Sequence, residues 1–172
     1  RTGADTALVI SKGFGDLLAI GDQTRPNLFD LQIIKPDLLY KTVLEIDERV
    51  RPLLGSEVKA SDTVTGKSGE AFRILQRPDP QLIRAGLQQI YDGGIRSVAV
   101  VCMHGYSFYK HELLIGEIAE EIGFTQISLS HQIMPQVKIV ARGDTTLVDG
   151  YLTPHIRCYL DSFQSGFIDR LG

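Results

Sequence analysis

Residues 93–106 read GGIRSVAVVCMHGY, and this stretch decides the fold class. The run from Val98 to Met103 is apolar, lacks polar alternation and is rich in β-branched side chains, which is typical of a strand buried on both faces. The Gly93-Gly94 pair before it is typical of a turn. Strands of this kind belong to parallel sheets covered by helices, so the stretch predicts an α/β fold.

A helix and a second strand are predicted directly downstream. Apolar side chains recur at helical spacing through residues 108–122, and Gly123 is placed to end that helix. The sequence FTQISLSHQI at 124–133 then predicts the second strand. The unit is therefore strand, helix, strand, with a right-handed crossover expected.

Polar side chains follow both predicted strands. In such units the groups after the carboxyl ends of the strands tend to face a ligand crevice. We therefore expect a ligand site at this edge of the sheet. The residues in question are His104, Gly105 and Tyr106 after the first strand, and Ser130, His131 and Gln132 after the second.

The upstream sequence adds further strands and helices. Residues 6–11 and 71–75 are predicted as short strands, and residues 42–50 as one half-exposed strand. Asp79 is a suitable N-cap for a helix that runs to Gly93. The fold class is α/β, with a mixed or parallel sheet and flanking helices. Residues 55–70, rich in Ser, Thr, Gly and Lys, predict a loop or hairpin.

The region after His131 is predicted to become helical. Residues 137–140 are expected to end a strand, and Asp144 to cap a helix in which Pro154 makes a kink or begins a second helix. A polar group lies at that expected helix start, where free N–H groups would favour an anion. Simple capping explains these residues equally well: Arg142, Asp144, Thr145, Thr146 and Asp149.

An apolar segment at 22–40 carries a second possible anion contact. Gln23 and Arg25 precede Pro26 there. Arg25 is either a surface arginine in a turn or a fork aimed at a carboxylate or phosphate.

Composition and missing motifs exclude several classes. A net charge of −3 without a run of Lys or Arg argues against a nucleic-acid or anionic-membrane binder. No convincing metal-ligand spacing is present, and the Gly-x-Gly at 13–15 lacks the rest of a dinucleotide fingerprint. Two distant cysteines and no 18-residue apolar span favour a reduced, cytoplasmic protein. The chain begins with Arg1 and stops within a helical pattern, so we expect a piece of a longer protein.

Several segments resemble a known family. TALVISKGFGDLLAIGDQTRPNLFDL at 6–31 is similar to the N-terminal region of the hydantoinase/oxoprolinase family, as are SVAVVCMHGY at 97–106 and GFTQISLSHQIMP at 123–135. The sequence VKIVARGDTTLVDGYLTPHIRCYL at 137–160 most resembles the family's eukaryotic-type 5-oxoprolinase branch.

The resemblance implies a fold, an activity and a division of the chain. Residues 1–131 would be the family's N-terminal region and 132–172 the truncated start of its hydantoinase A domain. The fold would be part of an actin/sugar-kinase-like (ribonuclease H-like) ATPase. The whole enzyme would use ATP and Mg²⁺ to open the lactam of 5-oxo-L-proline to L-glutamate, as a homodimer or larger assembly. Both phosphate-binding motifs of the family fall outside this sequence, so the fragment alone is expected to be inactive.

The implied chemistry suggests roles for the candidate residues. Phosphorylating the amide oxygen makes an imidate that water can attack, and a cationic fork holds the substrate carboxylate. His131 would be the catalytic residue that positions or deprotonates water, or it would only orient a neighbour. Gln23, Arg25 or Arg142 with its neighbours would bind substrate, so Arg142→Ala is expected to impair turnover more than stability. A hydantoinase-like cyclic amidase and a non-catalytic interaction module, acting through the apolar residues 28–39, are the alternatives.

Overall fold

A computed structural model describes residues 3–22, 37–54 and 61–171, with side chains up to residue 165. Four strands form a fully parallel sheet in the order β2-β1-β6-β7. The predicted α/β class with a parallel sheet is confirmed. The strands are β1 (Thr6–Ser11), β2 (Thr42–Ile46), β6 (Ser97–Val101) and β7 (Gln126–Leu129).

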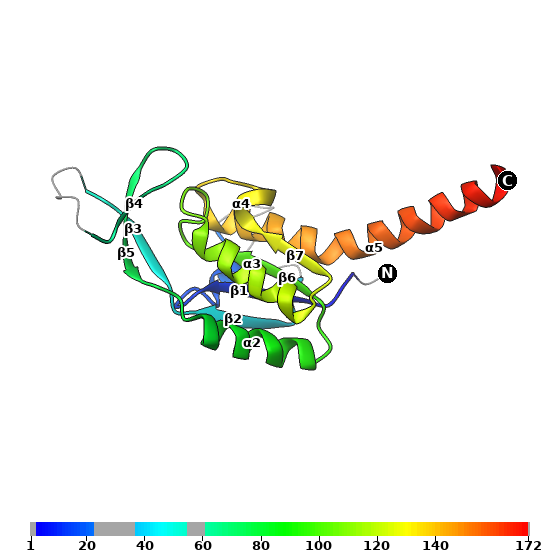
Figure 1. The fold of residues 1–172 in the computed structure, drawn as a ribbon, viewed down its shortest axis with the longest axis horizontal. Coiled ribbons are helices and arrows are strands. Elements are labelled where there is room, and N and C mark those ends of the chain that lie inside the picture. The colour runs from blue at the N-terminus through cyan, green and yellow to red at the C-terminus, as the bar shows by residue number, and fades with distance from the viewer. Residues whose placement is uncertain (1–2, 23–36, 55–60, 172) are drawn as a thin grey trace, which may run out of the picture.

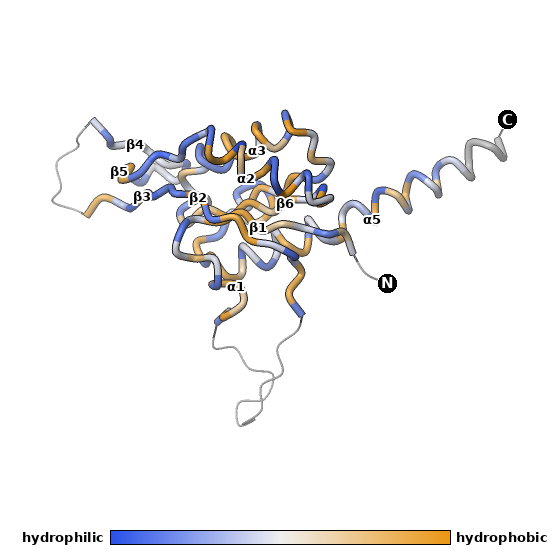
Figure 2. Tube along the Cα trace, turned by 90° about the horizontal axis from the view of Figure 1, so that it is seen from below, coloured by the Kyte–Doolittle hydropathy of each residue, from blue (hydrophilic) through white to orange (hydrophobic). Residues whose placement is uncertain are grey.

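Helices cover both faces of this sheet (Figure 1). One face packs against α2 (Pro80–Asp92) and α3 (Lys110–Ile122), the other against α1 (Leu17–Ile20) and α5 (Ile139–Leu171). Side chains of β1 alternate between the two cores, with Val9 toward α2 and α3 and Leu8 toward α1 and α5. The apolar centre of the sheet stands out in Figure 2. Burial on both faces explains why β1 and β6 lack polar alternation.

Two predicted helix ends are confirmed. The Asp79 carboxylate accepts a 2.8 Å hydrogen bond from the Gln81 N–H, and Pro80 occupies the first turn of α2. Gly123 ends α3 in the left-handed conformation, at φ 107°.

A second, antiparallel sheet stands beside the first, in the order β3-β5-β4. It contains β3 (Arg49–Pro52), β4 (Thr63–Thr65) and β5 (Ala71–Gln76). The prediction of one strand over 42–50 is wrong, because the chain leaves the parallel sheet at Asp47 and Glu48. Glu48 turns inward there and is 2% exposed. Of the predicted loop or hairpin at 55–70, residues 55–60 lie outside the described part of the chain, and 63–65 form β4.

The C-terminal part also differs from the prediction. Residues 137–140 form no strand, and α5 begins at Ile139 instead of Asp144. It runs as one helix through Pro154. Its first half packs on β6 and β7, and its second half projects from the body (Figure 1). The predicted domain boundary at 131/132 falls within α4 (Ser130–Ile133). Among the described helices, none combines the length and apolarity needed to cross a bilayer.

Candidate functional site

Glu112 ties together the carboxyl ends of β6 and β7. Its side chain is fully buried, and Oε1 accepts hydrogen bonds from the Cys102 N–H at 2.9 Å and the Ser130 hydroxyl at 2.5 Å. Oε2 lies 3.0 Å from the His131 backbone nitrogen and 2.7 Å from His131 Nδ1. No role was predicted for Glu112 from the sequence. Its position in the first turn of α3, close to the strand ends, was the available signal.

A second carboxylate–histidine pair lies at the end of β1. Glu48 Oε2 is 2.7 Å from His111 Nδ1, and the Ser11 hydroxyl donates to the other Glu48 oxygen. Ser11 in turn accepts a 2.9 Å hydrogen bond from the Met103 N–H. Buried carboxylates are stable only when paired and hydrogen-bonded, and both acids meet that condition.

Arg142 lies beside these pairs and is fully buried. Its guanidinium donates to the Gln136 carbonyl at 2.7 Å, to the Cys102 carbonyl at 2.5 Å and to the Met103 carbonyl at 3.1 Å. Burial lowers the pKa of Arg142, and the nearby Glu112 carboxylate opposes that shift. Arg142 therefore fixes the chain where it leaves β6.

The prediction that a helix starts at Asp144 is wrong, because α5 begins at Ile139. The threonine hydroxyls donate to carbonyls of their own helix. Thr145 donates to the Ala141 carbonyl at 2.9 Å, and Thr146 donates to the Arg142 carbonyl at 2.6 Å. These residues present no row of free backbone N–H groups to a ligand, since the orphan donors of a helix lie in its first turn.

Asp149 fastens α5 to the sheet. Its Oδ2 accepts hydrogen bonds from the Ser128 hydroxyl at 2.7 Å and the Gln126 side-chain amide at 3.1 Å. Its Oδ1 accepts a 2.8 Å hydrogen bond from the Thr153 hydroxyl. Gln23 and Arg25 lie outside the described residues.

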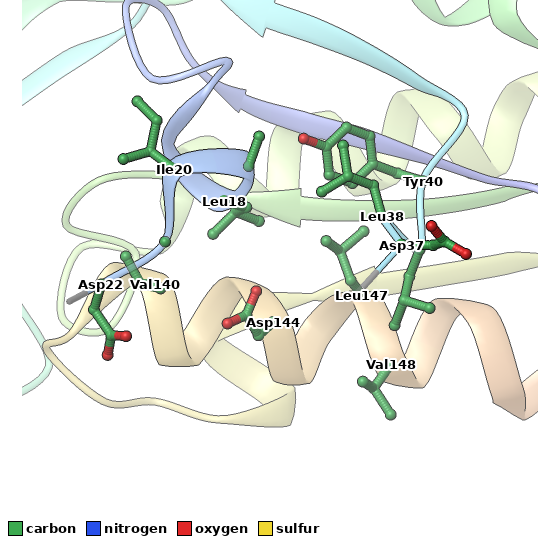
Figure 3. A pocket seen from close by; sticks show the side chains of 13 residues that line it. Leu18, Ile20, Asp22, Asp37, Leu38, Tyr40, Val140, Asp144, Leu147 and Val148 are labelled. Carbon is green, nitrogen blue, oxygen red and sulfur yellow. The ribbon is translucent and has the colours of Figure 1, made fainter. Parts of the chain in front are cut away.

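Asp144 faces a pocket of 480 Å³ between α1, residues 37–40 and α5 (Figure 3). The pocket wall is largely apolar, and Asp22 and Asp37 add two further carboxylates. Burial raises the pKa of Asp144, and the Asp22 charge raises it further. This acidic lining disfavours an anionic substrate. His131 and Arg142 do not line it, so the predicted set does not surround this pocket.

The loop after β1 already binds a carboxylate of the protein itself, that of Glu45. The backbone N–H groups of Gly13 and Gly15 both donate to Glu45 Oε1, each at 2.9 Å. The loop and Glu45 border a pocket of 530 Å³. The Gly-x-Gly at 13–15 was set aside as an incomplete dinucleotide fingerprint, so this arrangement was missed, although a Gly-x-Gly at the end of a buried strand was its signal.

The comparisons with known proteins agree with the resemblance noted in the sequence. The profile of the "Hydantoinase/oxoprolinase N-terminal region" matches residues 1–123. The chain is 46% identical over 179 residues to "5-oxoprolinase" from Dictyostelium discoideum and 44% identical over 173 residues to "5-oxoprolinase 1" from Arabidopsis thaliana. Each alignment covers 100% of this chain but 14% of the relative. The chain therefore spans a small part of the length of these relatives.

A solved structure shares the fold. The crystal structure of ATP-dependent caprolactamase from Pseudomonas jessenii matches 96% of this chain with a TM-score of 0.72 and 18% identity, over 22% of its own length. The parallel sheet and its helices are therefore an arrangement found in a larger protein. On the profile match and the identity over the whole chain, this protein belongs to the hydantoinase/oxoprolinase family.

Proposed function

We propose that the whole protein is an ATP-dependent 5-oxoprolinase, which hydrolyses 5-oxo-L-proline to L-glutamate in the cytoplasm as a homodimer or larger assembly. The observation that carries the proposal is 46% identity to a named 5-oxoprolinase over the full 172-residue chain. The likeness to a caprolactamase supports a cyclic amide as the substrate class, since caprolactam is also a lactam.

ATP and Mg²⁺ would supply activation of the poorly electrophilic lactam carbonyl carbon, through phosphorylation of the amide oxygen. The described residues do not fit the metal ion. Residues 3–22, 37–54 and 61–171 contain no set of three His, Cys, Asp or Glu side chains arranged to hold a metal ion. No step of the phosphoryl transfer is therefore assigned to these residues.

His131 is the side chain of this chain best placed to handle a proton. A Glu112 carboxylate can only accept, so the 2.7 Å contact assigns the proton to Nδ1 and leaves Nε2 as an acceptor. The imidazole also stacks on Tyr109, with ring centroids 4.9 Å apart. Its side chain keeps 11% exposure, whereas Glu112 keeps none. In this proposal Glu112 orients His131, and Nε2 takes a proton from the attacking water.

The activity is tested on the whole protein with 5-oxo-L-proline, hydantoin and caprolactam, each with and without ATP. We expect glutamate and ADP to form together from 5-oxo-L-proline, with little turnover of the other rings. Ring opening of hydantoin but not of 5-oxo-L-proline would reverse the assignment in favour of a hydantoinase-like amidase.

The role of His131 is tested with His131→Asn in the whole protein. General-base assistance typically contributes about 10²- to 10⁴-fold, so kcat should fall within that range. The melting temperature should change little, because the imidazole is at the edge of the buried network. His155→Asn, on the exposed part of α5, is the matched control. A kcat equal to that of the parent enzyme would remove His131 from the chemistry.

A further inference from the structure

We propose that the loop Lys12–Asp16 is a binding site for an oxyanion, a phosphoryl or carboxylate group of a small molecule, and that the Glu45 carboxylate is a built-in competitor for it. The site is separate from the His131–Glu112 pair. It does not depend on the proposed function, because the ligand class is read from the donors alone.

Two backbone donors converge on one point in this loop. Gly13 N–H and Gly15 N–H each lie 2.9 Å from Glu45 Oε1. Both precede Asp16, the residue before α1, so they belong to the loop and not to the helix. Gly13 has φ +87°, a conformation that glycine adopts readily and that turns its N–H toward the same point. Successive N–H groups arranged in this way form a concave anion site.

One cationic side chain packs against the same loop. Arg49 Nη2 donates to the Lys12 carbonyl at 2.6 Å, and the guanidinium lies 5.1 Å from the Phe14 ring centroid. Asp16 and Glu45 are the charged residues on the wall of the adjoining 530 Å³ pocket. An oxyanion at the glycine N–H groups would meet two donors with the Arg49 guanidinium nearby, once Glu45 has moved.

Glu45 is suited to be displaced. It lies at the exposed end of β2, the outer strand of the described sheet, where an ionic contact contributes little because water competes for it. A phosphate brings more acceptor oxygens and up to one more negative charge than the carboxylate it replaces. Glycine at position 15 also leaves room for the anion: a Cβ there would lie 3.0 Å from Glu45 Oε1 and would crowd an oxygen at that point.

The test is equilibrium dialysis of the whole protein with inorganic phosphate and, separately, with acetate, on the parent and on Glu45→Gln. Removing the competing charge should tighten binding of the preferred anion about tenfold, as expected when a charge-assisted hydrogen-bond pair is vacated. A gain for phosphate alone assigns a phosphoryl ligand, and a gain for acetate alone assigns a carboxylate ligand. The amide oxygen introduced by Glu45→Gln can itself accept from the Gly13 and Gly15 N–H groups. Glu45→Ala removes that acceptor, so the same measurement is made on it.

Two further variants show whether the gain in anion affinity arises at the glycine N–H groups. Asp47→Asn removes the same charge from the same end of β2 without touching the glycine N–H groups, so its affinity should stay within about twofold of the parent. Glu45→Gln combined with Gly15→Ala should return to the parent affinity, because the new methyl group fills the space. The proposal is overturned if neither anion binds Glu45→Gln or Glu45→Ala more tightly than the parent, or if Asp47→Asn gives the same gain.

Discussion

Arg142 packs against the chain where it leaves β6, and its guanidinium donates to three backbone carbonyls. The sequence suggested a substrate-binding role, with turnover more sensitive than stability. Complete burial reverses that expectation, because removing the guanidinium leaves carbonyls and the neighbouring Glu112 charge without compensation.

We expect Arg142→Ala to lower the free energy of unfolding by about 3 kcal/mol or more. Arg142→Lys should recover less than half of the loss, since an ammonium group cannot reproduce the planar fork. Urea unfolding midpoints measure both. The control is Arg157→Ala, an exposed arginine of the same helix, which should leave the midpoint unchanged. A near-parental midpoint for Arg142→Ala would contradict the structural role.

His104 makes the stability of the protein depend on pH. Burial lowers its pKa below the ordinary 6.5, Arg142 and Arg49 add to the shift, and Glu48 opposes it. Its Nδ1 is buried without a hydrogen-bond partner among the described residues. The unfolded chain therefore binds a proton at a higher pH than the folded chain does. We therefore expect the contribution of neutral, buried His104 to stability to be full above pH 6.5 and to be lost as the pH falls below it.

His104→Gln should remove part of that loss, because glutamine takes up no proton. Melting temperatures measured from pH 7.5 down to 5 should fall less steeply for this variant than for the parent, apart from any uniform offset. His155→Gln, at an exposed position, should keep the parental slope. Identical slopes for the parent and His104→Gln would show that another group is responsible.

At the scale of elements, α5 accommodates a proline because the sheet supplies the missing donor. Pro154 has no N–H for the carbonyl of Gly150, four residues earlier. The buried Ser97 hydroxyl at the start of β6 donates to that carbonyl at 2.7 Å. Gly150 permits the close approach, since a Cβ there would lie 3.1 Å from Thr6 Cγ2. The helix and the sheet are therefore joined at one backbone group.

A double-mutant cycle tests this joint. Ser97→Ala should cost about 1–3 kcal/mol, because it leaves a buried carbonyl without a donor. In a Pro154→Ala background the helix supplies its own N–H, so the same change should cost at least about 1 kcal/mol less. Thermal or urea unfolding of the four proteins gives the coupling energy. Additive effects would show that Ser97 and Pro154 act independently.

At the scale of the whole molecule, we expect local stability to differ between the central strands and the C-terminal half of α5. Residues of β1 and β6 are buried on both sides, whereas large apolar side chains of α5 beyond Pro154 are exposed. Amide hydrogen exchange should be slowest in β1 and β6 and much faster at residues 156–163, because few buried contacts hold that part of the helix. In the whole protein, slow exchange at 156–163 would instead show that the exposed stripe is covered there.

The sequence by itself determined the parallel α/β class, the strand–helix–strand unit around Val98–Met103, the Asp79 cap and the family. These follow from hydrophobic periodicity, local capping chemistry and similarity of short sequence segments, all of which involve residues close together in the chain. It also placed His104 and His131 directly after the ends of β6 and β7, where the structure has them.

Only the tertiary structure decided which polar residues meet at that edge. Glu112 contacts Cys102 and His131 across ten and nineteen positions, and Glu45 contacts Gly13 across thirty-two. The start of α5 and the burial of Arg142 were likewise misjudged, because Arg142 is held by the carbonyl of Cys102, just after β6 and forty residues away. Pairings of this kind are set by the packing of elements, and no local pattern in the chain encodes them.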